Sequence, residues 1–320
     1  MAEPFRMVLL PPYVEPDWPD LIREIVPGSI VEAFENPSDA AEAIALADVV
    51  YGTLPAELFA RAERLKWIAA PLAGLGPDWF HPALVASDVQ VTNMRGIYNE
   101  HLANHLIAFM LAFSRRFDVF AQKQARREWR RGELMIDLAS STALVVGVGG
   151  SGAEVGRLSK AFGMTVIGVD PRRTDAPDGF DSLVGVDQLD EVLPLADFVL
   201  ITAPETPQTI GMFDARRLSL MKPTAYLCNI ARGALVVTDD LVAALQNGTI
   251  AGAGLDVVSP EPLPPDHPLW ALPNVIITPH VAIAGAPGWY ERRTAIIVEN
   301  VRRFVAGEPL MNLVDKSNWF

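Results

Sequence analysis

An apolar stretch that begins at Thr142 runs directly into a glycine-rich turn, and a segment of helical period follows the turn. The turn has the spacing Gly-x-Gly-x-x-Gly and contains Gly147, Gly149, Gly150, Ser151 and Gly152. In this setting the glycines permit a tight turn, a close approach to the backbone and close packing of helix on strand. The free N–H groups at the start of such a helix attract phosphate. The segment therefore predicts an α/β sheet with a dinucleotide at its edge.

The next predicted strand, residues 165–169, ends at Asp170. A carboxylate at this place accepts hydrogen bonds from both hydroxyls of an adenosine ribose, which predicts NAD as the cofactor. Arg172 and Arg173 follow and would attract the 2′-phosphate of NADP, so NADP stays open as an alternative. Because Asp170 stands directly at the strand end, we expect NADH to be preferred over NADPH. A glycine-rich turn without a ligand would leave Asp170 unexplained.

Short apolar runs alternate with longer segments of helical period through the first part of the chain. This alternation is typical of a parallel sheet with helices on both faces. The predicted strands are residues 7–10, 30–34, 49–51, 67–70 and 89–92. From Glu100 the apolar residues recur every three or four positions, which predicts one long helix that runs towards Arg131 and ends at Gly132.

A second series of apolar runs follows Gly132. It predicts strands at residues 142–147, 165–169, 198–202, 225–229, 253–257 and 275–278, which make a complete doubly wound sheet. A last helix, about residues 287–305, stops at Gly307 and would return to pack on the first sheet. We therefore predict an α/β protein with two doubly wound parallel-sheet domains, in which a Rossmann domain (99–286) is inserted into the other (1–98 and 287–320). Two crossings of the chain, near residues 98–102 and Ala284, would make a hinge with a cleft.

The composition excludes several classes of protein. Half of the 320 residues are hydrophobic and 20% are charged, which is the balance of a globular chain. The formal net charge of −13 repels nucleic acid and anionic membrane surfaces. The one cysteine, Cys228, can form no internal disulfide and fits a reducing compartment, for which the cytoplasm is the default. Small molecules and other subunits are the expected partners.

Three polar side chains follow three predicted strands at their carboxyl ends. Arg232 comes after the strand that ends at Asn229, Glu261 follows the next strand, and His280 follows the last. In an open α/β sheet this edge faces the ligand crevice, so the three side chains are candidates for one catalytic site. Each alone would be an ordinary loop charge or a structural histidine, and their joint placement favours catalysis.

Four stretches of the chain resemble a known family, the D-isomer-specific 2-hydroxyacid dehydrogenases, including its glyoxylate/hydroxypyruvate reductase and phosphoglycerate dehydrogenase members. These stretches are residues 147–152, 229–236 (NIARGALV), 254–270 (GLDVVSPEPLPPDHPLW) and 272–282 (LPNVIITPHVA). The resemblance implies an NAD-dependent oxidoreductase that interconverts 2-keto acids and D-2-hydroxy acids. It also implies that the domain of residues 1–98 and 287–320 is a flavodoxin-like substrate domain, and that the protein is a homodimer.

The resemblance further implies roles for single residues. Arg232, Glu261 and His280 fall on the family's catalytic set. The implied cofactor-binding residues are the glycine turn, Asp170, Pro204, Thr209, Ile230, Ala231, Arg232 and Asp256. The implied substrate-binding residues are Ala73, Gly74 and Leu75, where backbone N–H groups would hold the carboxylate, together with Arg232 and His280. Two positions depart from the family: Asn104 stands where Glu is frequent, and Ser151 where a larger apolar residue is usual.

Reduction of a 2-keto acid needs an oriented cofactor, a proton donor and a cation beside the developing oxyanion. We expect His280 to be the acid in reduction and the base in oxidation, Glu261 to hold the imidazole, and Arg232 to bind the substrate with its planar fork. Two alternatives stay open. One is an NADH-sensing, corepressor-like binding protein on the same scaffold, and the other is a formate dehydrogenase, against which Glu261 counts.

His101 and His105 lie four positions apart on the predicted long helix, a spacing at which two imidazoles can share a metal ion. The residue after His101 is not Glu, and no third ligand lies nearby in the sequence. We therefore expect packing roles for both histidines and no metal site.

Overall fold

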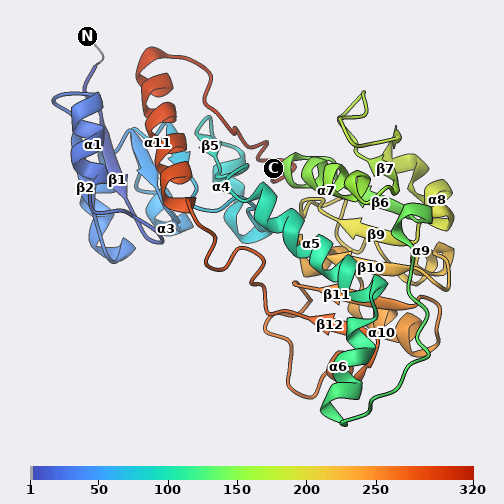
Figure 1. Ribbon diagram of the computed structural model, residues 1–320. Coiled ribbons are helices and arrows are strands. Elements are labelled where there is room, and N and C mark those ends of the chain that lie inside the picture. Colours follow the sequence, from blue (N-terminus) through green and yellow to red (C-terminus); the bar gives the residue numbers. More distant parts are fainter. Residues whose placement is uncertain (1–2) are drawn as a thin grey trace. The chain divides into compact units, whose positions relative to one another are not determined.

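The computed structural model describes residues 3–320. The chain forms two compact units. Unit 1 contains the chain up to Ile97 together with Pro287–Phe320, and unit 2 contains Tyr98–Ala286 (Figure 1). The chain thus passes between the units after Ile97 and again after Ala286. Both units contain a parallel sheet, which confirms the predicted fold class.

The sheet of unit 1 has five strands in the order β2-β1-β3-β4-β5, the order of flavodoxin-like folds. Each strand overlaps one predicted apolar run, and its first and last residues lie within two positions of the ends of that run. The strands are β1 (Arg6–Leu9), β2 (Ile30–Ala33), β3 (Val49–Tyr51), β4 (Trp67–Ala69) and β5 (Gln90–Thr92).

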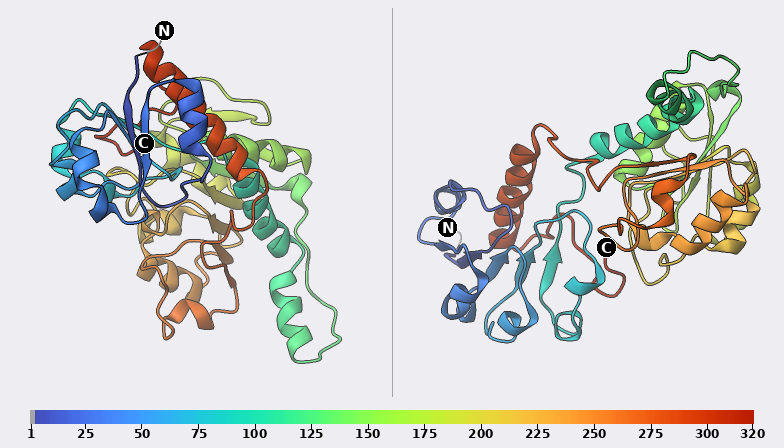
Figure 2. Two further views of the ribbon diagram at one scale, coloured as in Figure 1. Left: turned by 90° about the vertical axis from the view of Figure 1, so that its left-hand side faces the viewer. Right: turned by 90° about the horizontal axis from the view of Figure 1, so that it is seen from below.

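Helices cover both faces of this sheet. Ile44, Leu58 and Leu84 bring α2 (Ala41–Ala45), α3 (Ala56–Phe59) and α4 (Pro82–Val85) against one apolar face. On the other face α11 (Trp289–Ala306) lies beside α1 (Trp18–Ile25) (Figure 2). The indole of Trp18 donates to Thr294 Oγ1 (2.9 Å). The last helix therefore packs on the first sheet and ends before Gly307, as predicted.

The sheet of unit 2 has seven strands in the order β12-β11-β10-β9-β6-β7-β8, the doubly wound order of a Rossmann domain. They are β6 (Thr142–Val146), β7 (Thr165–Val169), β8 (Ser182–Val184), β9 (Phe198–Ile201), β10 (Tyr226–Asn229), β11 (Gly252–Leu255) and β12 (Val275–Ile277). The edge strand β8 is missing from the six predicted strands. It has only two apolar residues, so it forms no apolar run in the sequence.

Alternate residues of the strands in unit 2 face different layers of helices. Ala143 and Val145 pack towards α5 (Asn99–Ser114) and α7 (Gly150–Ala161). Leu144 and Val146 pack on the opposite side. That side is covered by α8 (Leu189–Val192), α9 (Ala215–Leu220) and α10 (Thr238–Gln246). The buried strands between two helical layers explain the continuous apolar runs in the sequence.

The prediction of one long helix towards Arg131 is wrong. The chain forms α5 and then α6 (Phe117–Ala125), and Arg116 between them has a left-handed backbone with φ 57°. The guanidinium of Arg116 donates to Tyr226 Oη (3.3 Å) and pairs with Asp118 (3.6 Å), and these contacts hold the break. The apolar period continues across the break, so the period alone could not reveal it. Within residues 3–320, every helix is too short or too polar to cross a membrane.

Candidate active site

The predicted glycine-rich turn joins β6 to α7. A side chain at Gly147, where φ is +94°, would collide with the backbone of Ala203, and one at Gly152 would collide with the carbonyl of Gly147. These glycines therefore hold the turn tightly against the sheet. Gly149 is exposed and faces open space, which leaves its main chain and the first N–H groups of α7 open to an anion. The turn thus fits the pyrophosphate of a dinucleotide.

The amide side chain of Asn99, at the start of α5, lies over this turn. Ser151 Oγ donates to Asn99 Oδ1 (3.2 Å), and a side chain at Gly150 would collide with the same amide. Sequence reasoning missed Asn99, because the two segments are far apart in the chain and the motif specifies only the turn itself.

Asp170 follows β7 as expected, but its carboxylate bonds to the neighbouring backbone. Oδ2 accepts the N–H of Val148 (2.8 Å), and Oδ1 accepts those of Arg172 (2.9 Å) and Arg173 (3.1 Å). The Nε of Arg173 in turn donates to the carbonyl of Val148 (2.6 Å). Asp170 therefore ties the loop after β7 to the glycine-rich turn, a function that the sequence pattern did not indicate.

The strands β10, β11 and β12 are neighbours in the sheet, and the three catalytic candidates follow their carboxyl ends. The structure brings two of them into contact, since His280 Nδ1 lies 2.9 Å from Glu261 Oε2. Glu261 Oε1 accepts the N–H of Val258 (3.0 Å), which orients the carboxylate. The His280 side chain is 48% exposed, so the ring remains open on its other side.

Arg232 lies in the loop after β10, and Asn229 shapes this loop. The Asn229 side chain donates to the carbonyl of Arg232 (2.9 Å) and accepts the N–H of Ala231 (2.9 Å). A side chain at Gly233 would collide with the carbonyl of Val258. The glycine therefore lets the Arg232 loop approach the loop that begins after β11 and carries Glu261.

Burial lowers the pKa of the Arg232 guanidinium, and the nearby charges of Glu205 and Glu261 act in the opposite direction. An arginine remains cationic at neutral pH even when its pKa falls below the usual value. The site therefore contains a desolvated cation, an arrangement suited to binding a carboxylate or a developing oxyanion.

Asp256 follows β11 and is 2% exposed. Its Oδ1 accepts the hydroxyl of Thr278 (2.6 Å) and the N–H of Val281 (2.9 Å), and its Oδ2 accepts the N–H of Ala282 (3.1 Å). Its carbonyl accepts the N–H of His280 (2.7 Å). Asp256 therefore holds the segment that contains His280. Sequence reasoning did not single out Thr278, because one hydroxyl at a strand end carries little signal.

The other predicted cofactor residues follow β9 and β10. Thr209 Oγ1 donates to the carbonyl of Pro204 (2.7 Å) and accepts the N–H of Thr206 (2.8 Å), so Pro204 and Thr209 belong to one turn after β9. Ile230 and Ala231 lead from β10 into the loop of Arg232, and Ile230 is buried.

The predicted substrate loop lies in unit 1, after β4. The side chain of Asn93 donates to the carbonyl of Ala73 (2.9 Å), and the N–H of Met94 donates to the carbonyl of Leu72 (3.0 Å). Leu75 is 3% exposed and belongs to the apolar core of unit 1. Its side chain is therefore a structural group.

The two imidazoles of α5 lie beside different groups. Within the described residues 3–320, no group of three or more His, Cys, Asp or Glu side chains is arranged to hold a metal. His101 Nε2 lies 3.8 Å from Glu100, and His105 Nε2 lies 2.9 Å from Thr278 Oγ1.

Residues 107–282 match the family model described as D-isomer specific 2-hydroxyacid dehydrogenase, NAD binding domain. The glyoxylate reductase of Korarchaeum cryptofilum is 34% identical over 306 residues, which are 93% of this chain and 89% of the relative. The glyoxylate/hydroxypyruvate reductase A of Escherichia fergusonii is 31% identical over 314 residues, 93% of this chain and 94% of the relative.

The fold also matches a crystal structure of a D-isomer specific 2-hydroxyacid dehydrogenase from Xanthobacter autotrophicus, solved in complex with NADPH and MES. The TM-score is 0.81 at 30% identity, and the match covers 98% of each chain. The family match spans more than half of this chain and includes the strand ends that carry Arg232, Glu261 and His280. The chain therefore belongs to the D-isomer-specific 2-hydroxyacid dehydrogenases, and it is an oxidoreductase that acts on CH–OH groups with NAD(H) or NADP(H).

Proposed function

We propose that this chain reduces a small 2-keto acid to the D-2-hydroxy acid, with glyoxylate and hydroxypyruvate as the first candidate substrates. The observation that carries the proposal is the His280–Glu261 pair, at 2.9 Å, on the sheet edge that also contains Arg232. The substrate class comes from the relatives named glyoxylate reductase and glyoxylate/hydroxypyruvate reductase A.

His280 is the proposed proton donor in reduction and proton acceptor in oxidation. Its Nδ1 contacts Glu261, so Nδ1–H donates to the carboxylate and Nε2 is the atom that exchanges a proton with substrate. Glu261 thus fixes both the orientation and the tautomer of His280.

Arg232 is the proposed binding group for the substrate. Its planar fork can bond to the carboxylate and to the carbonyl oxygen of a 2-keto acid at once. Its positive charge stabilises the negative charge that develops on that oxygen. Burial strengthens this electrostatic attraction, because less water screens it. We propose that backbone N–H groups of Ala73, Gly74 and Leu75 hold the same carboxylate.

The proposed cofactor site begins at the glycine-rich turn, where Gly149 exposes its main chain. The nicotinamide cofactor, when bound, supplies the hydride for the carbonyl carbon. The turn would bind the pyrophosphate, and Asp170 would meet the ribose. The proposed site is completed by Gly147, Gly150, Ser151, Gly152, Pro204, Thr209, Ile230, Ala231, Arg232 and Asp256.

Steady-state assays of the wild-type protein with glyoxylate, hydroxypyruvate, pyruvate, phenylpyruvate and 2-ketoisocaproate test this proposal, each with NADH and with NADPH. Turnover of at least one keto acid to the D-hydroxy acid is the expected result. Binding of NADH with a change of assembly and negligible turnover would favour the corepressor-like alternative. Oxidation of formate as the main activity would favour a formate dehydrogenase.

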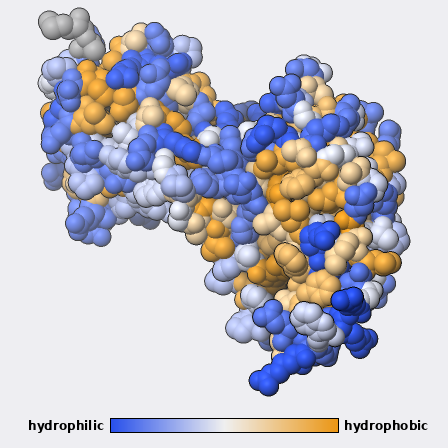
Figure 3. Space-filling model, in the orientation of Figure 1, coloured by the Kyte–Doolittle hydropathy of each residue, from blue (hydrophilic) through white to orange (hydrophobic). Residues whose placement is uncertain are grey.

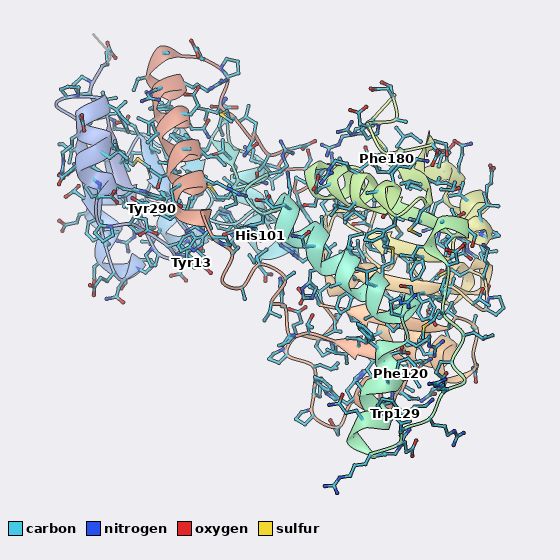
Figure 4. The ribbon with its side chains drawn as sticks, viewed as in Figure 1. Tyr13, His101, Phe120, Trp129, Phe180 and Tyr290 are labelled. Carbon is cyan, nitrogen blue, oxygen red and sulfur yellow. The ribbon has the colours of Figure 1, made fainter. Side chains whose placement is uncertain are left out.

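We propose that the protein is a homodimer formed through the arm, by which we mean α6 with the loop of residues 126–135. The arm exposes large apolar side chains, with Trp129 97% and Leu134 87% exposed. Figure 4 shows Phe120 and Trp129 together in this region, and Figure 3 shows hydrophilic residues around its end. The loop contains Arg126, Arg127, Arg130 and Arg131, although the chain as a whole has a charge of −13. A second copy of this acidic chain complements such a surface.

Light scattering coupled to size-exclusion chromatography tests the homodimer. We expect twice the mass of 34.8 kDa for the wild-type protein and a shift towards one copy for Trp129→Ala combined with Leu134→Ser. Leu195→Ala, another exposed apolar position of unit 2 at 51%, is the matched control. A monomeric wild-type protein would contradict the proposal.

We also propose that the protein acts in the cytoplasm. The support is its one cysteine, whose side chain is fully buried in β10 and free of any disulfide, as is usual in a reducing compartment. Fractionation of the native host, with an antibody against this chain, tests the location.

A further inference from the structure

His105, on α5, contacts the end of β12 through its imidazole. Nε2 lies 2.9 Å from Thr278 Oγ1 and 3.5 Å from Asp256 Oδ1. The hydroxyl of Thr278 lies 2.6 Å from Asp256 Oδ1 and donates its one proton to that carboxylate. The Thr278 oxygen therefore accepts the Nε2–H of His105. A continuous chain of hydrogen bonds runs from His105 through Thr278 to Asp256.

The far end of this hydrogen-bond chain holds the backbone around His280. The carboxylate of Asp256 accepts the N–H groups of Val281 and Ala282, and its carbonyl accepts the N–H of His280. The φ of His280 is +54°, a conformation that residues with a side chain rarely adopt. Bonds to Asp256 on both sides of this backbone turn keep His280 in that conformation.

The position of His105 depends on close packing between α5 and β11. A side chain at Gly254 would approach the ring of Phe109 to 2.6 Å, so the glycine lets the helix lie this near. The Phe109 ring meets the His105 ring edge-on, with centroids 4.9 Å apart. His105 is therefore fixed by Phe109 on one side and by Thr278 on the other.

We propose that His105 is a positioning residue for the reaction and that it acts on His280 through Thr278 and Asp256. This inference rests on the proposed function, in which His280 is the proton donor. Loss of the His105 N–H frees the Thr278 hydroxyl to turn, which loosens its bond to the buried Asp256 carboxylate. The His280 backbone then loses part of the support that sets the direction of its imidazole. Proton transfer is sensitive to such a change, because a misplacement of about 1 Å costs roughly 100-fold in rate.

Three single variants test whether the N–H of His105 matters. His105→Phe keeps an aromatic ring beside Phe109 but has no donor, and we expect kcat to fall by roughly 10- to 100-fold with the cofactor Kd unchanged. His105→Gln places an amide N–H near the former Nε2 and should restore most of the rate. His101→Phe, one turn earlier on α5 (Figure 4), is the matched control and should keep the wild-type rate. Wild-type kcat in His105→Phe would overturn the proposal.

A double-mutant cycle tests whether the effect passes through Thr278. Thr278→Val removes the hydroxyl that links His105 to Asp256. If both residues act along one chain of hydrogen bonds, His105→Phe should cost little once Thr278 is Val. Losses that simply add would show that His105 acts by another route. If His105→Phe does not fold, His105→Asn replaces it, because the shorter amide cannot reach Thr278.

Nuclear magnetic resonance of isotope-labelled histidine tests the same inference without turnover. The chain has five histidines, and the His280→Gln variant identifies the signal of His280. We expect His105→Phe to shift the His280 signal and His105→Gln to return it, while His81 and His267 stay unchanged. This result in a protein that turns over no keto acid would sustain the positioning effect and refute the proposed function. An unchanged His280 signal in an active protein would refute the positioning effect alone.

Discussion

A single substitution at His280 tests its role as proton donor separately from the binding of the cofactor. His280→Gln removes the proton donor but keeps an amide that can still reach Glu261, so the local structure should survive. We expect kcat to fall by at least roughly 100-fold, the usual contribution of a general acid. The Kd for NADH should hardly change, as measured by quenching of protein fluorescence. Near-normal kcat in the folded variant would assign proton transfer to another group.

Asp170 governs the second prediction, which concerns the choice between NADH and NADPH. Its carboxylate would repel a 2′-phosphate. Arg172 is exposed, so an ion pair between its guanidinium and that phosphate would contribute only about 1 kcal/mol of binding free energy. We expect a higher kcat/KM with NADH, and a weaker or inverted preference in Asp170→Ala. Because this carboxylate also accepts three backbone N–H groups, the variant should bind both cofactors less tightly.

Arg172→Ala provides the control for this prediction, because it removes the exposed charge and leaves the Asp170 bonds in place. It should lower the use of NADPH more than that of NADH. Use of NADPH by the wild-type protein that equals or exceeds its use of NADH would show that the arginines, and not Asp170, determine the preference.

The sequence could predict where the candidate residues lie because parallel strands end at one common edge. Arg232, Glu261 and His280 follow three neighbouring strands, as expected from their spacing. It could not predict which partners the buried carboxylates take. Asp170 and Asp256 accept backbone N–H groups of loops whose conformation depends on the packing around them, and no pattern of residue types specifies that conformation.

At the scale of whole elements, the contact between α5 and β11 leaves no room for an added side chain at Gly254. A methyl group at Gly254 would meet the Phe109 ring at 2.6 to 3.0 Å. We expect Gly254→Ala to lower the free energy of unfolding by about 1–3 kcal/mol, the usual cost of overpacking a core. Urea unfolding followed by circular dichroism measures the change.

The control for this prediction is Gly76→Ala, where an added methyl group meets nothing within 4 Å and φ is −83°. It should leave the free energy of unfolding nearly unchanged. The double variant Gly254→Ala with Phe109→Leu should recover part of the loss, since the smaller side chain makes room. Full stability of Gly254→Ala alone would mean that α5 can move away from the sheet at little cost.

Prediction of the elements succeeded where the apolar pattern is strong and failed where local geometry decides. Among the described residues, eleven of the twelve strands lie in or beside predicted runs, because strands buried on both faces are apolar along their length. The break between α5 and α6 depends on one left-handed residue, Arg116, and on its contacts with Tyr226 and Asp118. Tyr226 is distant in the sequence and Asp118 is a common residue type, so neither one indicates the break in the sequence.

For the molecule as a whole, the thiol of Cys228 makes the free energy of unfolding depend on pH. Burial raises the pKa of its thiol from 9.0 to about 12. A folded-state pKa above that of the unfolded chain means that the contribution to stability is complete below about pH 9 and declines as pH rises towards 12. We expect the free energy of unfolding to fall more steeply over this range in the wild-type protein than in Cys228→Ala. Parallel curves for the two proteins would exclude the thiol as the cause.

Unit 1 is assembled from both ends of the chain, and this has a consequence for its synthesis. Trp18 and Trp67 lie against Thr294 and Phe304 of α11, so one face of the first sheet is covered in part by residues that the ribosome makes only after unit 2. Domains fold as units while the chain emerges from its amino end. Unit 2 is therefore made before α11 is available to the first sheet. A nascent chain that stalls before Pro287 presents a folded unit 2 tethered to a sheet with an exposed apolar area, which chaperones and proteases can recognise.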